Sequence, residues 1–202
     1  MTRKSALIMV DMSNEQVAAL PADQKRRIVD AIQKLSKVPG WTLKIDSRLW
    51  LFSDKESTLS RVYPEWGTTM GIPESQGADL IPELVDNTTC CQEQQQRVPW
   101  EFIEKKHYSS FVDSHLQARL QQEEITDVYL VGINTDYCIF NTAMDSFARV
   151  KLNTFVVEEG VGSIAGTKGH EEGLTWIRAH LGPQAVVPLQ RVLATISSKC
   201  CS

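Results

Sequence analysis

Short apolar runs alternate along the chain with segments whose apolar residues recur every three or four positions. Strands buried on both faces give continuous apolar runs, and helices with one buried face give the second pattern. The runs predict six strands, at residues 6–11, 41–46, 100–105, 127–132, 153–158 and 185–189. The periodic segments predict four helices, at residues 21–38, 114–122, 138–150 and 169–181.

Strands that alternate with helices are typical of a parallel sheet covered by helices on both faces. We therefore expect an α/β fold, a three-layer α/β/α sandwich with a central, mostly parallel six-stranded sheet. The 202 residues are 42% hydrophobic, enough for one sizeable core, so residues 1–202 are expected to form a single domain. Residues 51–80 show turn residues, aromatics and little periodicity, which indicates a long active-site loop with short local structure.

The charge balance and hydropathy of the chain exclude two classes of partner. Its net charge is −4, and it lacks the basic patch expected of a nucleic-acid-binding protein. No apolar run approaches the roughly 18 residues that span a bilayer. The N-terminal run meets Asp11 without a cleavage site, so it indicates a strand and not a signal peptide. We expect a cytoplasmic protein that acts on a small molecule.

One of the five cysteines, Cys138, stands between an apolar strand and the start of a predicted helix. Backbone N–H groups at a helix N-terminus favour a thiolate over a thiol, so this is a position suited to a nucleophile. The other four cysteines form two adjacent pairs, Cys90–Cys91 and Cys200–Cys201, that resemble neither a metal site nor a disulfide and are read as incidental thiols.

Two charged residues are predicted to lie at the same sheet edge as Cys138. Asp11 closes the first predicted strand and Lys105 closes the third. Sites in such sheets form at the carboxyl ends of the strands, although a strand-ending Asp is often a turn former and a Lys there is often solvated. The carboxylate could take the thiol proton and the ammonium could stabilise negative charge. A cysteine–histidine pair stays open as an alternative, with His107 as the candidate.

At these residues the chain resembles the isochorismatase-like cysteine hydrolases, which include nicotinamidases, N-carbamoylsarcosine amidohydrolases and ureidoacrylate amidohydrolases. The resemblance covers nearly the whole chain, and three of its segments are ALIMVDMSN, KKHYSSF and GINTDYCIFNTAMDSF. It implies a catalytic triad of Asp11, Lys105 and Cys138. It further implies a non-proline cis peptide at Ile133–Asn134 and an oxyanion hole formed by the N–H groups of Asn134 and Cys138. It also implies a homo-oligomer, a homodimer or homotetramer.

The chain departs from the metal-binding members of this family. Nicotinamidases carry Asp-x-His after the second strand and a further histidine downstream, whereas here the comparable residues are Asp46, Ser47 and Arg48, and residues 50–79 contain no histidine. A zinc site needs about three protein ligands. We therefore expect no metal and no cofactor. Arg48 is predicted either to bind a substrate carboxylate or to form a structural ion pair.

These observations predict a metal-independent cysteine amidohydrolase that cleaves a C–N bond of a small amide, ureido or carbamoyl compound through a thioester. Siderophore-type isochorismatases lack the cysteine, so Cys138 argues against vinyl ether hydrolysis. Two alternatives remain: a nicotinamidase with an altered metal site, and a non-catalytic binding protein of the same fold. Trp50, Trp66 and Tyr137 are candidates for the walls of the substrate pocket, or for general packing.

Overall fold

The structure is a computed structural model that describes residues 3–85 and 98–199. Cys90, Cys91, Cys200 and Cys201, which the sequence indicates to be incidental thiols, lie outside the described residues.

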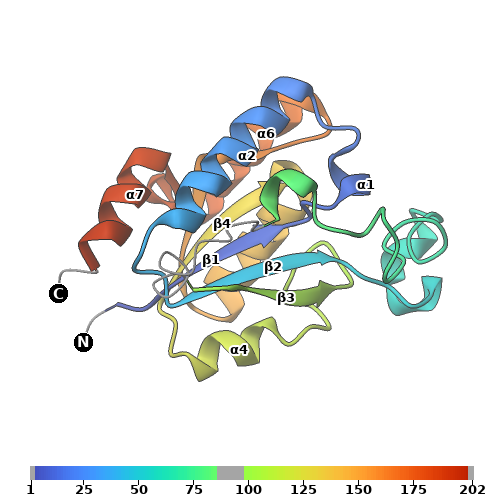
Figure 1. Cartoon of the computed structure of the whole chain (residues 1–202), viewed down its shortest axis with the longest axis horizontal. Helices are drawn as coiled ribbons and strands as arrows, with labels where there is room; N and C mark the ends of the chain where they lie inside the picture. Colours follow the sequence, from blue (N-terminus) through green and yellow to red (C-terminus); the bar gives the residue numbers. More distant parts are fainter. Residues whose placement is uncertain (1–2, 86–97, 200–202) are drawn as a thin grey trace.

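A six-stranded sheet forms the centre of the molecule (Figure 1), and all five of its strand pairings are parallel. The strand order is β3-β2-β1-β4-β5-β6, so the chain winds outward from β1 in both directions. Every residue of β1 and β4 is buried, as their continuous apolar runs require. The strands are β1 Ser5–Val10, β2 Leu43–Leu49, β3 Trp100–Lys105, β4 Asp127–Ile133, β5 Asn153–Gly162 and β6 Val186–Val187.

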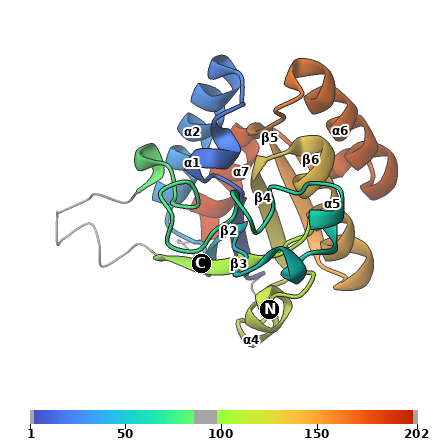
Figure 2. The same ribbon diagram turned by 90° about the vertical axis from the view of Figure 1, so that its right-hand side faces the viewer.

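Helices cover both faces of this sheet (Figure 2). On one face α2 (Ala22–Lys37) and α7 (Leu189–Ser198) pack on an apolar cluster that includes Leu7 and Met9 of β1. On the other face α4 (Leu116–Gln122), α5 (Phe140–Met144) and α6 (Gly166–Leu181) pack on a cluster that includes Ile8 and Val10. The predicted three-layer α/β/α fold is confirmed.

The remaining described elements are short. They are α1 Asn14–Val17, the 3₁₀ turns Asp54–Glu56, Thr58–Arg61, Pro82–Leu84 and Pro183–Ala185, and the π-helical turns Thr135–Ile139 and Asp145–Arg149. Two of the 3₁₀ turns fall in residues 51–80, the segment predicted to be a loop with short local structure. Within this loop, the Leu51 N–H donates to the Gly71 carbonyl at 2.7 Å, which brings two parts of the loop together. The loop is also fixed to α1, because Glu15 Oε1 accepts from the Gly71 N–H at 2.7 Å.

Three elements differ from the sequence-based expectation. The last strand is only two residues long, and the unpredicted helix α7 begins at Leu189, where the strand was expected to end. The helix expected at 138–150 begins earlier, at Thr135, with a π turn. Its expected apolar face, which includes Phe147, is not the buried one, since Phe147 is 45% exposed. A π turn takes more residues than an α turn and so rotates the later side chains around the axis.

No helix of residues 3–85 and 98–199 is long and apolar enough to cross a membrane.

Candidate active site

Three strand ends bring Asp11, Lys105 and Cys138 together. Asp11 directly follows β1, Lys105 is the last residue of β3, and Cys138 lies in the π turn after β4. The Lys105 ammonium and the Asp11 carboxylate form an ion pair at 2.7 Å. The Cys138 thiol is close enough to both groups for their charges to act on it. All three side chains are buried, with exposed fractions of 4% or less, so the group is shielded from bulk water.

The backbone around Asp11 fixes the direction of its carboxylate. Asp11 has φ 55°, a left-handed conformation that Asp adopts more readily than most residues. Its N–H donates to the Ser47 carbonyl at 2.9 Å, which extends the pairing of β1 with β2 by one bond. Its Oδ1 accepts from the Leu49 N–H at 3.1 Å, and its Oδ2 faces Lys105. Because each oxygen has a fixed partner, the carboxylate presents a defined edge to the thiol.

The electrostatics of the site keep the thiol protonated. Burial raises the pKa of Cys138 to about 12, Lys105 opposes this rise, and the Asp11 carboxylate adds to it. This overturns the expectation of a resting thiolate, because desolvation and a neighbouring anion outweigh the helix N-terminus. Burial lowers the pKa of Lys105, but the neighbouring Asp11 and Cys138 outweigh it and leave the pKa raised. The resting group is therefore a thiol beside a carboxylate–ammonium pair.

The turn that carries Cys138 is built around Gly132 and the bond that follows Ile133. The Ile133–Asn134 peptide bond is cis, and Gly132 has φ 108°. A Cβ at Gly132 would lie 2.1 Å from the Val10 carbonyl oxygen, so only glycine lets β4 approach β1 this closely.

Neighbouring segments hold the same turn from the other side. Asn134 Oδ1 accepts from the Ile164 N–H at 2.9 Å. Thr135 Oγ1 lies 3.0 Å from His170 Nδ1 of α6. A Cβ at Gly173 of α6 would lie 2.6 Å from the Thr135 carbonyl carbon. The residues predicted to form the oxyanion hole are thus on a turn fixed by side-chain and backbone contacts.

Aromatic side chains form a cluster beside Lys105. The Lys105 ammonium lies 5.7 Å from the centre of the Trp66 ring, which packs edge-on against Tyr108 at 6.1 Å. The ring centre of Tyr108 lies 5.5 Å from that of Tyr137, a residue that is 44% exposed. The Tyr108 hydroxyl donates to the Tyr63 hydroxyl at 2.7 Å. Burial, followed by the Tyr63 hydroxyl, raises the pKa of Tyr108, so its phenol stays neutral.

Two of these aromatic residues, Tyr63 and Tyr108, were not among the site residues predicted from the sequence. Tyr108 stands three residues after Lys105 in the segment that resembles the family, which was the available signal. Tyr63 lies in the loop of residues 51–80, whose shape no periodicity predicts. Trp66 and Tyr137, both proposed as pocket walls, do lie in this cluster.

Arg48 and Trp50 belong to a different group of contacts. Arg48 Nε donates to both carboxylate oxygens of Asp46, at 3.1 and 2.9 Å, and Arg48 Nη1 donates to the Ala78 carbonyl. The guanidinium lies 4.8 Å from the Phe102 ring centre, and Trp50 packs edge-on against the same ring at 4.9 Å. Of the two alternatives for Arg48, the structure contains the ion pair. It does not bring Trp50 into the aromatic cluster around Lys105.

The residues around Asp46 do not fit a metal ion. The Arg48 guanidinium already occupies both oxygens of the Asp46 carboxylate, and a cation placed there would meet a positive charge. In the two described segments of the chain, no three His, Cys, Asp or Glu residues are grouped so as to hold a metal. Burial raises the pKa of Asp46 to about 6, against the opposing effect of Arg48.

His107, the candidate partner in a cysteine–histidine pair, has other contacts. Its Nε2 lies 2.9 Å from Asp113 Oδ2 and its Nδ1 lies 3.4 Å from Ser57 Oγ. Since Ser57 belongs to the loop of residues 51–80, His107 connects that loop to the end of β3. The groups that contact the thiol are Asp11 and Lys105.

Comparison with known proteins agrees with this fold. The family model of the isochorismatase domain matches residues 5–187. The chain belongs to the isochorismatase family. It is therefore a hydrolase of that family, as the resemblance of its three segments implied.

The similar proteins include both characterised and uncharacterised members. An uncharacterised isochorismatase family protein of Bacillus subtilis is 26% identical over 186 residues, which cover 88% of this chain and 93% of that protein. The pyrazinamidase/nicotinamidase of Streptococcus mutans superposes with a TM-score of 0.72 at 24% identity, over 91% of this chain and all of the other. The N-carbamoylsarcosine amidase of Thermoplasma acidophilum superposes with a TM-score of 0.67 at 20% identity, over 92% and 95%.

Proposed function

We propose that this isochorismatase-family hydrolase is a cysteine amidohydrolase that cleaves a C–N bond of a small amide, ureido or carbamoyl compound through a thioester. The observation that carries the proposal is the buried contact of the Cys138 thiol with the ion pair of Asp11 and Lys105. A nucleophile, a base and a fixed positive charge are what acyl transfer at a carbonyl needs. The nicotinamidase and the amidase of similar fold also support it.

The first half of the reaction forms the thioester. Asp11 takes the thiol proton while Sγ of Cys138 attacks the carbonyl carbon, and the N–H groups of Asn134 and Cys138 hold the oxygen that becomes negative. A donor of this kind contributes about 3 kcal/mol to the transition state. The C–N bond then breaks, and Asp11 returns its proton to the departing ammonia or amine.

The second half releases the acid. Water attacks the thioester carbonyl while Asp11 takes its proton, and the C–S bond breaks to regenerate the thiol. Lys105 stays charged in both halves and offsets the negative charge that moves among carboxylate, sulfur and oxygen.

Two features of the site bear on the substrate. Trp66, Tyr108 and Tyr137 form a cluster of flat rings beside Lys105, which suits a small planar carbonyl compound. The Arg48–Asp46 ion pair supports the metal-independent form of the reaction, since it leaves no carboxylate oxygen for a metal.

A Cys138→Ala variant tests the covalent mechanism. We expect ammonia release from a panel of small amides, ureido acids and carbamoyl compounds to fall below detection in the variant, while Cys138→Ser retains a trace. Equal thermal unfolding temperatures of the three proteins would show that the loss is chemical. Hydrolysis by Cys138→Ala at the wild-type rate would refute the thioester.

The metal requirement has its own test. Wild-type protein dialysed against a chelator should keep its full kcat/KM, and added Zn²⁺ should not increase it. A nicotinamidase with an altered metal site, suggested by the Streptococcus mutans enzyme of similar fold, would instead turn over nicotinamide and respond to zinc. A non-catalytic binding protein would release no ammonia from any compound.

A cytoplasmic location and a homodimer or homotetramer remain proposals; gel filtration with light scattering measures the oligomer.

A further inference from the structure

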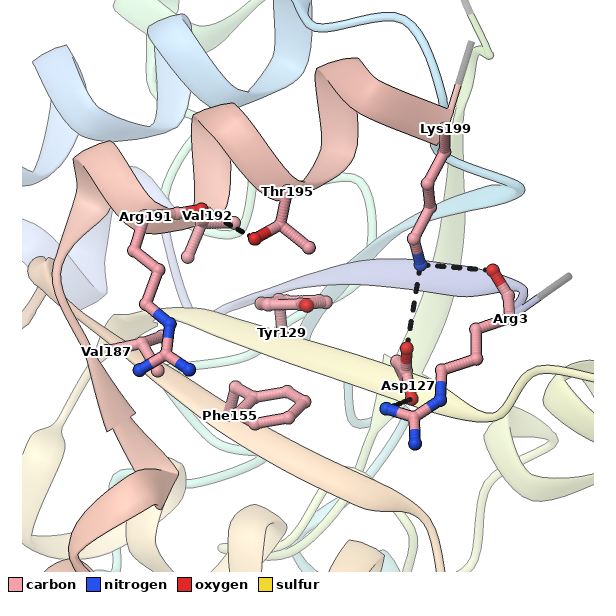
Figure 3. A pocket seen from close by; sticks show the side chains of 9 residues that line it. All are labelled: Arg3, Asp127, Tyr129, Phe155, Val187, Arg191, Val192, Thr195 and Lys199. Carbon is pink, nitrogen blue, oxygen red and sulfur yellow. Dashed lines mark hydrogen bonds and ion pairs between the residues drawn. The ribbon is translucent and has the colours of Figure 1, made fainter. Parts of the chain in front are cut away.

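A cavity of about 200 Å³ opens at the edge of the sheet where the strands begin, beneath α7 (Figure 3). It lies between the first residues of β4 and β5, the short β6, α7, and Arg3, which stands two residues before β1. The seven residues of β4 separate this edge from the turn that carries Cys138, a distance of about 20 Å at the rise of an extended strand. The cavity is therefore separate from the proposed active site.

The floor of the cavity is aromatic. Tyr129 of β4 and Phe155 of β5 are paired in the sheet, and their rings stack at 5.0 Å with an interplanar angle of 25°. Trp41 packs edge-on against Tyr129 at 5.4 Å, which helps to fix the position of that ring. Tyr129 is buried whereas Phe155 is only partly buried, so Phe155 offers ring surface for one planar ring to pack against.

The walls of the cavity carry three positive charges and one negative charge. The Asp127 carboxylate lies 4.0 Å from Arg3 and 3.5 Å from Lys199, and it also accepts from Asn153 Nδ2 at 2.8 Å. The Asp127 carboxylate is therefore already paired with neighbouring positive charges and a hydrogen-bond donor. Figure 3 shows Arg3, Asp127 and Lys199 at one side of the aromatic pair, with Arg191 at the other side.

Arg191 has a guanidinium that remains available. It is exposed, and it forms no ion pair with any residue in the described ranges 3–85 and 98–199. The hydroxyl of Tyr129 also has no hydrogen-bond partner among the described residues. Burial, and then Asp127, raises the pKa of Tyr129 to about 12, so this hydroxyl remains a donor at neutral pH. The cavity thus offers unpaired donors and excess positive charge beside an apolar face.

We propose that this cavity is a binding site for a small aromatic carboxylate, with its ring against Phe155 and its carboxylate on the Arg191 guanidinium. Arg forms two parallel hydrogen bonds to a carboxylate, and the aromatic floor selects a flat body over a compact ion. The volume is below the roughly 300 Å³ at which pockets for drug-sized ligands begin, so it suits a single ring. The site is independent of the reaction proposed for Cys138.

Benzoate titrated into the isotopically labelled full chain and followed by amide NMR shifts tests the proposal. We expect saturable shifts at Val187 and Val192, which line the cavity. Neutral benzyl alcohol has a similar size and no C–N bond for the proposed reaction to cleave. It should bind at least about tenfold more weakly, because it lacks the charge that Arg191 pairs with. Shifts confined to Asn134 and Tyr137 would place benzoate at the active site and overturn the proposal.

Two variants and a control locate the contacts. Arg191→Ala should weaken benzoate binding at least about tenfold, the loss expected for a charge-assisted pair, whereas Arg26→Ala, an exposed arginine of α2 outside the cavity, should leave it unchanged. Phe155→Leu keeps an apolar side chain but removes the flat face, so it should also weaken binding. Unchanged affinity in Arg191→Ala, or in Phe155→Leu, contradicts the proposed pose.

Discussion

Replacing Asp11 with Asn should make Cys138 more acidic and the enzyme inactive. In the wild-type protein the Asp11 carboxylate contributes to the raised pKa of the thiol, and Lys105 opposes it. Asn keeps the shape of the side chain and removes its charge. The thiolate then becomes the partner of the Lys105 ammonium, so ionisation of the thiol becomes easier while the base that the reaction needs is lost.

The size of the change follows from Coulomb's law. Two unit charges about 4 Å apart interact by roughly 4 kcal/mol at the effective dielectric constant of about 20 that describes protein sites. One pKa unit corresponds to about 1.4 kcal/mol, so removing the carboxylate should lower the pKa of Cys138 by about three units from its wild-type value of about 12. Loss of the general base should lower kcat/KM by a factor of about 10² to 10⁴.

The assay is the rate of iodoacetamide alkylation of the Cys138 peptide, measured by mass spectrometry as a function of pH, beside ammonia release from the best substrate. The matched control is Asp145→Asn, the same substitution on the helical segment that carries Cys138. Asp145 pairs with Arg149 and not with the thiol. If the pH at which alkylation reaches half its maximum rate is unchanged or higher in Asp11→Asn, the electrostatic account is refuted. Wild-type hydrolysis by that variant would refute the role of Asp11 as the base.

Three further predictions concern stability. Lys105→Met should destabilise the fold by about 3–5 kcal/mol in urea unfolding, because it leaves the Asp11 carboxylate buried without its ion pair; a change under 1 kcal/mol would contradict this. Since the pKa of Asp46 is raised from 3.8 to about 6, the folded protein binds more protons than the unfolded chain between these values, and stability should fall as pH rises from about 4 to 6. Asp46→Asn should reduce that fall by about 3 kcal/mol, and an identical pH profile in the variant would count against it. Gly132→Ala should cost about 3 kcal/mol or more, because its Cβ meets the Val10 carbonyl at 2.1 Å. The control Gly166→Ala has φ 75° with no atom within 4 Å, and should cost only about 1 kcal/mol; equal losses would disprove the steric argument.

The hydrophobic pattern predicted the layers of the fold because both faces of the parallel sheet are covered. Strands such as β1 and β4 are buried throughout, so their sequences are continuous apolar runs that mark their own position. Helix α7 escaped prediction although Leu189, Val192 and Ile196 are its buried face, because its first residue continues the apolar run of β6. A run that changes from strand to helix without a polar residue between them gives no boundary.

The positions of Asp11, Lys105 and Cys138 could be predicted because each follows or ends a strand, and parallel strands end at one edge. The protonation of the thiol could not be predicted, since it depends on burial and on the charges around it. The aromatic wall was only partly predicted, because Tyr63 lies in a loop held by tertiary contacts. The Arg48–Asp46 contact was one of two alternatives that the sequence left open.

The charge of the buried group explains why the proposed reaction uses three side chains. In the resting state the Asp11 carboxylate, the Lys105 ammonium and the Cys138 thiol sum to zero charge. When the proton moves from sulfur to carboxylate, the sum is still zero, so no net charge has to be stabilised away from water. Without Lys105 the same step would take place in a site carrying one uncompensated negative charge at every stage. The ammonium therefore acts on the whole sequence of steps, and its loss should slow both thioester formation and thioester hydrolysis, which single-turnover measurements with an activated ester can separate.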